Sequence, residues 1–585
     1  MSASGPQAAP ALPPSPADHF IQGLAHRNQG RVDLALNSFT RVLQAGGDAP
    51  EMKVEFARCV QQIQFTQAPP EFRRLVGRAM AEGWVRPSGL LDSARSLILL
   101  NEAVRRSVDL AAKSWPDRLT REELFGPLDS STIADDPVFR AVLENVSMDS
   151  VAFERFLTMA RAALLDTAAD IPADGPSMSS AVLDFHCALA RQCFINEYVF
   201  MLTPEEQLRA LALRDALSAR IAEGAPVPPA WIAAVASYFS LDSVPQAHTL
   251  PQEASLPAGI RAILKQQIEE PEQERAHRKS VRRLSSIDDP ISQRVQQQYE
   301  QNPYPRWTQT AIVTAVATLD DFITQRFPES PFRPRNNPHG VDILIAGCGT
   351  GQQSIETAQQ YRAARVTAID ISLRSLGYAI RKTEELGLGN IAYAQADLLQ
   401  RDALEQTFDL IEVMGVLHHL ADPLAGWRAL LARLRPGGVM RVALYSELAR
   451  ASVVAGRELI TQSGFAADAE GIRECRQAIM APDNAQRFGS LLSSPDFYGM
   501  STCRDLLFHV QEHRYTTLQL REMLEALNLT FIGFDIDPTK LGRYLGRFPD
   551  DRAATNLENW HAFESEATDT FAGMYQFWVQ KPGTT

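Results

Sequence analysis

One short segment constrains the fold of this chain more than any other feature. Residues 343–351 read ILIAGCGTG, so an apolar strand runs directly into three glycines at alternate positions. The next apolar strand ends in an acidic residue, Asp370. Glycines let a ligand approach the backbone where a Cβ would clash, and a carboxylate in this position accepts hydrogen bonds from a ribose diol. The pattern predicts a nucleotide-binding cleft.

The spacing of the glycines narrows the class of nucleotide. Dinucleotide sites favour G-x-G-x-x-G, whose third glycine lets the helix pack closely on the strand. Here the spacing is G-x-G-x-G, and Gln352 stands in the place of that third glycine. No Lys-Ser or Lys-Thr pair follows, as a Walker loop would require. Gln352 thus disfavours an NAD-dependent oxidoreductase, which stays a weaker alternative.

With a hydrophobic strand, G-C-G-T-G and then a helix, the chain resembles the class I S-adenosylmethionine-dependent methyltransferases. The resemblance is specific over residues 341–446 and extends in outline over 292–585. It implies a Rossmann-like, mostly parallel seven-stranded sheet and S-adenosyl-L-methionine as cofactor. The alternation of strand and helix patterns between residues 341 and 445 independently predicts a parallel sheet with helices on both faces.

The resemblance also implies which residues contact the cofactor. The glycine turn would line its amino-acid and ribose portions, Asp370 its ribose, and Asp397 its adenine amino group. The expected cofactor-binding residues are Gly347, Cys348, Gly349, Gly351, Asp370, Ile371, Asp397, Leu398, Tyr304 and Arg306. One position departs from the family pattern, because Ile345 stands where members usually carry an acid.

Tyr304 and Arg306 belong to a stiff segment with two prolines, residues 302–307 (NPYPRW). Arg306 could pair with the cofactor carboxylate, and the faces of a tyrosine or of Trp307 could meet the sulfonium. The alternative is that this segment is a rigid brace between two domains.

Candidate catalytic residues lie in the segment EVMGVLHHL, residues 412–420. Glu412 could orient the cofactor amine or the acceptor. His418 or His419 could accept a proton from the acceptor, since histidine titrates near neutrality; alternatively the pair serves packing. No N-P-P-Y motif is present, which disfavours a DNA base or a glutamine as acceptor.

Residues 509–513 spell H-x-x-E-H, a pattern also found in zinc proteases. No peptidase scaffold surrounds it, so we expect this stretch to line the acceptor side of the cleft or to pack there. A metal site is not predicted.

The first half of the chain is predicted to be helical. Helical periodicity extends over residues 17–267, and residues 20–50 resemble one tetratricopeptide helix pair through Gly30, Ala35, Phe39 and Leu43. An ordinary helical bundle is the alternative. We further expect a disordered tail over residues 1–16 and a charged linker over 268–291. The methyltransferase domain would span 292–585, with a core at 341–446, a helical insertion at 447–500 and C-terminal strands within 529–580.

Composition limits the partners and the compartment. The formal charge is −13, from 57 basic and 70 acidic residues, which makes a nucleic-acid partner unlikely. Six scattered cysteines without a C-x-x-C pair favour a reducing compartment, and no apolar run reaches the length of a membrane span. We therefore predict a cytoplasmic protein.

The predicted function is methyl transfer from S-adenosylmethionine to a protein, a peptide or a small-molecule nucleophile. A helical-repeat surface suits a protein acceptor or partner. The alternative is a helical-repeat scaffold whose methyltransferase domain senses the cofactor or is inactive.

Overall fold

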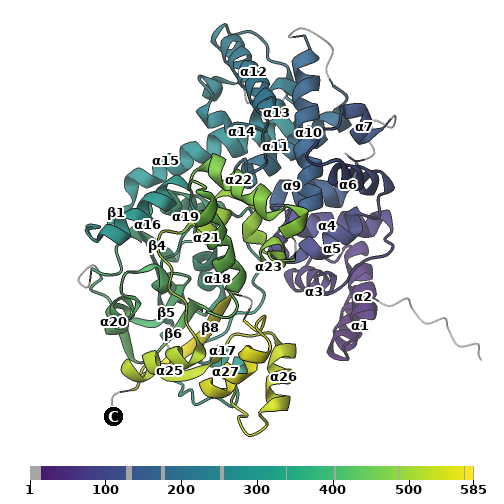
Figure 1. Ribbon diagram of the computed structural model, residues 1–585. Helices are drawn as coiled ribbons and strands as arrows, with labels where there is room; N and C mark the ends of the chain where they lie inside the picture. The colour runs from purple at the N-terminus through teal and green to yellow at the C-terminus, as the bar shows by residue number, and fades with distance from the viewer. Residues whose placement is uncertain are drawn as a thin grey trace, which may run out of the picture.

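The computed structural model describes residues 15–126, 133, 135–172, 178–250, 256–337, 339–400, 404–484, 486–571 and 573–583. A helical region and an α/β region pack side by side (Figure 1). Most of the expected tail, residues 1–14, lies outside the described residues. Ser15 is the N-cap of the first helix, where it forms a capping box with Asp18.

Every element described between residues 16 and 280 is a helix, which confirms the predicted all-α region. The α-helices are α1 (Pro16–Asn28), α2 (Val32–Gln44), α3 (Pro50–Val60), α4 (Pro70–Ala81), α5 (Leu91–Ile98), α6 (Glu102–Ser114), α7 (Arg121–Phe125), α9 (Pro137–Asn145), α10 (Val151–Asp170), α11 (Ser180–Ile195), α12 (Pro204–Ala222), α13 (Pro229–Ala236), α14 (Ala258–Leu264) and α15 (Glu270–Ser280). Short turns of other helix types join them at Pro87–Leu90 (η1), Leu241–Ser243, Ala247–Thr249 and Lys265–Glu269. Several helices begin with proline, whose fixed φ suits the first helical turn.

Helices α1 and α2 form the pair that resembles a tetratricopeptide repeat. Gly30 adopts a left-handed conformation in the turn, and Ala35 and Phe39 are fully buried. Gly23 of α1 lies against the Phe39 ring, so closely that a Cβ there would clash. The pair is thus tightly packed, while its assignment to the tetratricopeptide class stays a prediction.

The α/β region is built on one mixed sheet with the strand order β1-β4-β3-β2-β5-β6-β8-β7. Its strands are β1 (Arg282–Arg283), β2 (Val341–Ala346), β3 (Ala364–Asp370), β4 (Ile391–Gln395), β5 (Phe408–Met414), β6 (Leu434–Tyr445), β7 (Thr530–Phe534) and β8 (Met574–Gln580). All neighbours are parallel except β8, which is antiparallel to both β6 and β7. The predicted Rossmann-like sheet is confirmed, with one strand more than the seven expected.

Helices cover both faces of this sheet because its central strands are apolar on both sides. On β2, Ile343 and Ile345 face a core shared with α17 (Leu319–Arg326), α18 (Gln352–Gln360) and α19 (Leu373–Glu385). Leu344 and Ala346 face the opposite core, formed with α20 (Pro423–Arg433), α25 (Thr517–Ala526), α26 (Pro538–Arg547) and α27 (Leu557–Glu566). Side chains that alternate along β2 therefore contribute to the hydrophobic cores on both faces of the sheet.

The segment expected to be a charged linker, residues 268–291, is folded instead. It contains the whole of α15 and strand β1, which pairs with β4 at the edge of the sheet. Arg381 of α19 is buried and forms ion pairs with Glu270 and Glu274 at 3.3 and 3.0 Å. The acidic residues of this segment thus bind a cation of the α/β region, which is why it does not behave as a solvated linker.

The helical insertion, expected at 447–500 within the methyltransferase domain, extends to Phe508 and packs against the helical region. It consists of α21 (Ala451–Ser463), α22 (Ala469–Ile479), α23 (Gly489–Leu492) and α24 (Met500–Phe508). These helices share one hydrophobic core with α2 to α11, against which α22 and α23 lie in Figure 1. The insertion therefore belongs to the helical region in space and to the α/β region only in sequence.

A buried ion pair joins the insertion to the helical region. Arg476 of α22 contacts both carboxylate oxygens of Glu154 in α10, at 2.5 and 2.9 Å, and its Nε donates to the Phe497 carbonyl at 2.7 Å. The Arg476 side chain is 0% and the Glu154 side chain 3% exposed.

None of the described helices combines the length and the apolar composition that crossing a membrane requires.

Replacing Glu154 by glutamine should leave the Arg476 charge buried without its counter-ion. We expect a loss of about 3–5 kcal/mol in the free energy of unfolding, measured by chemical denaturation. The control is Glu458→Gln, which removes an exposed pair with Arg487 on the same insertion and should cost less than about 1 kcal/mol. Equal effects of the two substitutions would contradict the structural role of the buried pair.

Candidate functional site

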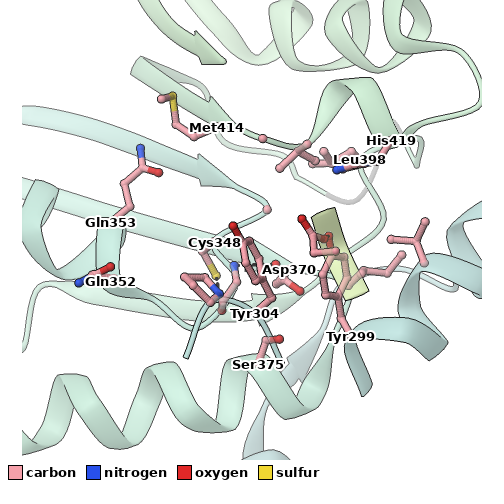
Figure 2. A pocket seen from close by; sticks show the side chains of 18 of the residues that line it. Tyr299, Tyr304, Cys348, Gln352, Gln353, Asp370, Ser375, Leu398, Met414 and His419 are labelled. Atoms are coloured by element: carbon pink, nitrogen blue, oxygen red, sulfur yellow. Dashed lines mark hydrogen bonds between the residues drawn. The ribbon is translucent and has the colours of Figure 1, made fainter. Parts of the chain in front are cut away.

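A cavity of about 430 Å³ opens at the carboxyl edge of the parallel strands, where ligands of open α/β sheets bind (Figure 2). Its walls come from the β2–α18 turn, the ends of β3, β4 and β5, helix α16 (Pro290–Gln301), and residues 304–305. Of the expected site residues, Tyr304, Gly347, Cys348, Gly349, Asp370, Ile371, Asp397, Leu398 and His419 line it.

The glycine turn is bare because other parts of the protein approach it. Gly349 has a φ of +51°, and a Cβ there would lie 2.6 Å from the Tyr304 carbonyl oxygen. A Cβ on Gly347 would overlap Val416, which follows β5. Gly351 caps α18 and packs against Ala379, so it does not line the cavity. The first two glycines bring three chain segments together at one wall, while the third serves packing.

Asp370 lies at the end of β3 with its carboxylate in the cavity wall. One oxygen accepts the Gly349 N–H at 2.7 Å and the other the Ser372 N–H at 2.8 Å. Burial raises the pKa of Asp370 to about 6, although these backbone hydrogen bonds favour the charged form. Asp370 can accept further hydrogen bonds from hydroxyl groups of a ligand.

Asp397 follows β4 and has an unused acceptor. Its Oδ1 accepts the Leu399 N–H at 3.0 Å, while Oδ2 is buried and has no hydrogen-bond partner among the described residues. A buried carboxylate oxygen without a partner is costly, so it suits a ligand that donates a hydrogen bond. Ile371 and Leu398 supply apolar walls beside it. Together they fit a flat heterocycle with an exocyclic amine.

The segment 302–307 contributes one expected residue to the cavity and not the other two. Tyr304 lines it, whereas the Arg306 guanidinium lies 4.1 Å from the ring centre of Phe194 and 3.9 Å from Glu197, both in the helical region. The position of Arg306 is therefore contrary to the expected contact with the cofactor carboxylate.

Trp307 does not line the cavity either. Its indole N–H donates to the carbonyl and hydroxyl oxygens of Thr350 at 3.2 and 3.1 Å, behind the glycine turn. Trp307 packs within the α/β region, against Tyr378 and Ile355, and so supports the glycine turn.

Two arginines that sequence analysis missed do line the cavity. Arg86, in the helical region, forms an ion pair with Glu356 of α18, with one contact of 2.8 Å. Arg441 of β6 pairs with Asp535 at 2.8 Å. Arg86 is separated from the glycine turn by most of the helical region, so no local sequence signal could have placed it there.

Glu412 lies on the strand next to Ile345, the position at which members of the resembling family usually carry an acid. Residues Ile345 of β2 and Glu412 of β5 are partners in the parallel register. The Glu412 carboxylate is buried and accepts hydrogen bonds from Gln353 at 2.5 Å and Thr357 at 2.9 Å. These two residues line the cavity, whereas Glu412 itself does not. The acid that β2 lacks at Ile345 thus has a counterpart, Glu412, on the adjacent strand β5. Glu412 lies behind the cavity wall and contacts it through Gln353 and Thr357.

The two candidate histidines differ in their surroundings. His418 is fully buried, stacks on Tyr445 at 3.8 Å between ring centres, and does not line the cavity. Burial lowers the pKa of His418 well below its usual range. His419 lines the cavity and donates through Nδ1 to the Gln511 carbonyl at 2.7 Å. His419 is therefore the histidine that can touch a ligand.

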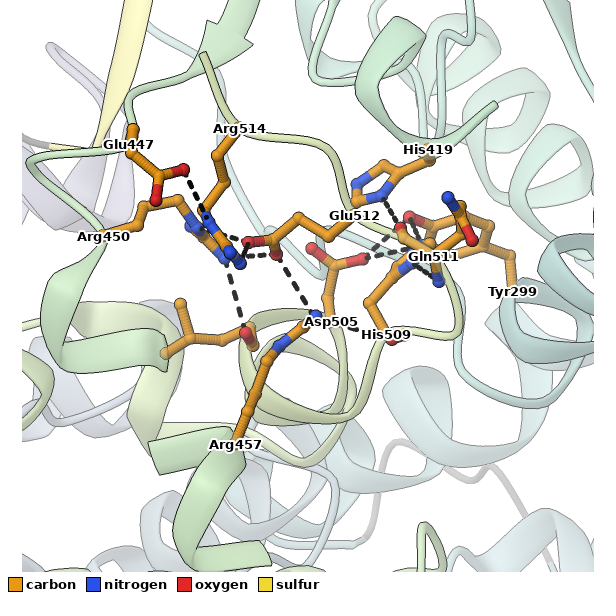
Figure 3. A network of polar contacts seen from close by, with 11 residues as sticks. Tyr299, His419, Glu447, Arg450, Arg457, Asp505, His509, Gln511, Glu512 and Arg514 are labelled. Atoms are coloured by element: carbon orange, nitrogen blue, oxygen red, sulfur yellow. Dashed lines mark hydrogen bonds and ion pairs between the residues drawn. The ribbon is translucent and has the colours of Figure 1, made fainter. Parts of the chain in front are cut away.

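A polar cluster that sequence analysis did not assemble lies beside His419 (Figure 3). Asp505 of α24 lines the cavity and accepts the Tyr299 hydroxyl at 2.7 Å. His509 stacks on His419, with 3.6 Å between ring centres and 22° between planes. Asp505 carries no recognisable motif, and only the packing of the insertion brings it to this site.

His419, Asp505 and His509 each offer an atom within 4.8 Å of the others, an arrangement that could suggest a metal ion. However, nearly parallel stacked rings cannot direct their in-plane lone pairs at one ion. The Gln511 N–H also donates to Nδ1 of His509 at 3.2 Å, which places that ring's proton on Nε2. The cluster is better described as a hydrogen-bonding site.

The H-x-x-E-H residues do not form a zinc-protease site, because residues 509–513 follow the end of α24 and are not helical. The Glu512 carboxylate is fully buried and ion-paired with Arg450 at 2.9 Å and Arg457 at 3.2 Å. His513 contacts the Leu420 carbonyl at 3.1 Å. The stretch packs against the turn after β5, in line with one of its two expected roles.

Comparison with known proteins gives matches to the α/β region. Residues 343–438 match the family described as "Methyltransferase domain". The uncharacterized protein syc1184_c of Synechococcus sp. is 31% identical over 272 residues, which cover 43% of this chain and 62% of that protein. The ubiquinone biosynthesis O-methyltransferase of Methylocella silvestris is 36% identical over 130 residues, covering 21% of this chain and 49% of the relative. The chain thus spans between about half and three fifths of the length of these relatives.

Among solved structures, PKMT2 from Rickettsia typhi in complex with AdoHcy is 13% identical, with a TM-score of 0.35. That match covers 47% of this chain and 55% of the other.

Replacing Gly349 by alanine should destabilise the turn for two separable reasons, the left-handed φ and the contact with Tyr304. Gly387→Ala is the matched control, because Gly387 has a φ of +67° and no atom within 4 Å of the added Cβ. We expect the control to cost about 1–2 kcal/mol and Gly349→Ala clearly more, in unfolding measured by denaturant. Equal losses would show that the close approach to Tyr304 has no energetic weight.

Proposed function

We propose that the class I S-adenosylmethionine-dependent methyltransferase domain in the C-terminal half of this chain transfers a methyl group to a nucleophile on a protein, a peptide or a small molecule. The observation that carries this proposal is the buried Oδ2 of Asp397, which no described residue pairs with, in one cavity with Asp370 and the glycine turn. The match of residues 343–438 to a methyltransferase family supports it.

Different residues of the cavity would bind different parts of the cofactor. Asp397 would accept the adenine amine and Asp370 the ribose hydroxyls. The amide groups at the start of α18 would face the cofactor carboxylate, because helix N-termini favour anions. Glu412, acting through Gln353 and Thr357, would favour the cofactor amine, so the domain does not depend on an acid at Ile345.

Methyl transfer needs little covalent help from the protein. When bound, the cofactor supplies an activated methyl on a sulfonium. The chain must hold the acceptor in line with that methyl and keep water out. The cluster of half-buried Tyr299 and buried His419 and Asp505 is the part of the cavity that the cofactor-binding residues would leave for the acceptor.

The helical region supports a protein acceptor or partner, because it contributes Arg86 to the wall of the cavity. The scaffold alternative is favoured by one observation, the loss of the family's acid at Ile345. The counterpart at Glu412 weighs against it.

Calorimetric titration with S-adenosylmethionine, followed by tritiated methyl transfer into a lysate from cells that lack the protein, tests the proposal. We expect binding and labelled product. Binding without transfer to any fraction would favour a cofactor sensor, and no binding by the wild-type protein would refute the enzyme.

Asp397→Asn should weaken cofactor binding, because the amide would turn a donor toward the adenine amine. We expect about a tenfold loss of affinity by calorimetry, equivalent to about 1.4 kcal/mol. Asp342→Asn is the control, since that buried carboxylate pairs with Arg365 and Arg435 at the opposite edge of the sheet and should leave affinity unchanged. Wild-type affinity in Asp397→Asn would contradict the adenine contact.

Cofactor affinity should fall as the pH decreases through about 6. The pKa of Asp370 in the unliganded protein is raised to about 6, and hydrogen bonds from ribose favour its charged form. Protonation below that pH competes with binding, so binding releases a proton. Calorimetry in two buffers of different ionisation enthalpy measures this release.

Burial and the charge of Asp505 also raise the pKa of Asp496 to about 6. If Asp370 is the group that titrates, Asp496→Asn should keep the loss of cofactor affinity below about pH 6, and Asp370→Asn should abolish this pH dependence. The reverse result would assign the titration to Asp496.

A further inference from the structure

We propose that the methyl acceptor is a primary amine, held between Asp505 and His419 at the end of the cavity beside Tyr299 and Tyr304. The inference rests on the proposed function and adds the acceptor class and a catalytic residue, Asp505.

The first argument is the number of hydrogen-bond acceptors. Asp505 is 5% exposed, and its carboxylate lies within 4.8 Å of a ring nitrogen of His419. The Gln511 carbonyl can only accept, so Nδ1 of His419 carries the proton and Nε2 has the free lone pair. Two acceptors, one carboxylate and one imidazole nitrogen, therefore lie at one place in the cavity wall.

A neutral amine matches that pair. It has two N–H groups to donate and keeps its lone pair for the methyl group. A hydroxyl has one O–H, so an alcohol can donate to only one of these two acceptors at a time. The site should therefore prefer the amine over the alcohol of the same shape by roughly tenfold or more.

The second argument is charge. Asp505 and Asp496 are both acidic, and the charge of Asp496 is the main cause that raises the pKa of Tyr304 far above its usual range. Arg450, whose charge acts on Asp496 and Tyr304, and Arg457 are already paired with Glu512 at 2.9 and 3.2 Å. The two arginines in the cavity wall, Arg86 and Arg441, are paired with Glu356 and Asp535. A carboxylate or phosphate acceptor would meet Asp505 in the cavity wall and would also be repelled by Asp496, which interacts with Tyr304 and Asp505 without lining the cavity, whereas an ammonium group would be attracted.

The third argument is the aromatic lining. Tyr299 and Tyr304 line the cavity close to Asp505, whereas the ring of Tyr445 is covered by Arg450 and His418. Aromatic faces attract ammonium and methylammonium groups, and they exclude the water that would compete with the amine. Tyr299 also donates to Asp505 and so holds the carboxylate in place.

The reaction balances with these groups alone. The ammonium form of the acceptor gives one proton to the Asp505 carboxylate. The nitrogen lone pair then forms the N–CH₃ bond while the C–S bond breaks, and its electron pair stays on sulfur as S-adenosylhomocysteine. The product leaves as a secondary ammonium, and the Asp505 carboxyl returns its proton to water.

The chemical identity of the labelled product tests the inference. After tritiated methyl transfer into the lysate, we expect label on nitrogen, stable to acid and to base and recovered as methylated amine. Label recovered from the protein fraction as methyl-lysine or as a methylated N-terminal amine, or from the small-molecule fraction as a methylated free amine, would support the proposal, whereas label on arginine or histidine would contradict it. Label released by base as methanol, or found on oxygen, sulfur or carbon, would overturn it while leaving the methyltransferase function intact.

A binding measurement tests the residues without relying on activity. With S-adenosylhomocysteine bound, we expect n-butylamine to bind to the wild-type protein at least tenfold more tightly than n-butanol. Asp505→Asn and His419→Asn should each remove this preference, the latter because asparagine can replace the Nδ1 donor but not the Nε2 acceptor.

Affinity for S-adenosylhomocysteine should stay within twofold in both variants, which shows that they are folded. Glu458→Gln on the exposed face of the insertion is the control and should keep the amine preference. An unchanged preference in Asp505→Asn, or none in the wild type, would refute the acceptor site.

Discussion

The site depends on the absence of side chains at two positions of the β2–α18 turn. Gly349 lets the Tyr304 carbonyl approach to a distance that no Cβ would allow, and Gly347 does the same for Val416. Tyr304 lies between β1 and β2 in sequence and Val416 follows β5, so one turn fixes two segments from different parts of the chain. The acceptor-side tyrosine and the His419 turn are both positioned by these contacts.

The shared helical core has an equally direct consequence for the cavity. Because α21 to α24 pack with α2 to α11, the insertion is held in place by the helical region, and Asp505 is delivered to the cavity from α24. Arg86 reaches the same cavity from the helical region itself. Burying the ion pair of Glu154 and Arg476 costs desolvation free energy, and removing one partner would cost more. The pair therefore fixes how the insertion packs against the helical region.

Buried carboxylates in this protein differ in how completely they are paired, and that difference separates their roles. Glu512 is surrounded by arginines and is structural. Asp370 is held by two backbone N–H groups and retains capacity for a ligand. Asp397 has an oxygen without a partner among the described residues, which makes it the most ligand-dependent of the three.

The sequence alone determined the features that depend on local pattern. The alternation of strand and helix patterns between residues 341 and 445 predicted the parallel sheet, in which the apolar strands 341–346 and 408–414 lie side by side. The glycine turn and the acids that end β3 and β4 lie at fixed spacings along consecutive β–α units, so they could be assigned from sequence. Ile345 was recognised as a departure, but its counterpart Glu412 follows from strand register, which residue order does not encode.

Only the tertiary structure decided the rest. It turned Arg306 toward the helical region, folded the expected linker into α15 and β1, and assigned the insertion to the helical core. It also brought Asp505 and His509 to His419. These outcomes depend on contacts between residues far apart in the chain, where burial and charge pairing select one packing and local propensity carries no information about the partner.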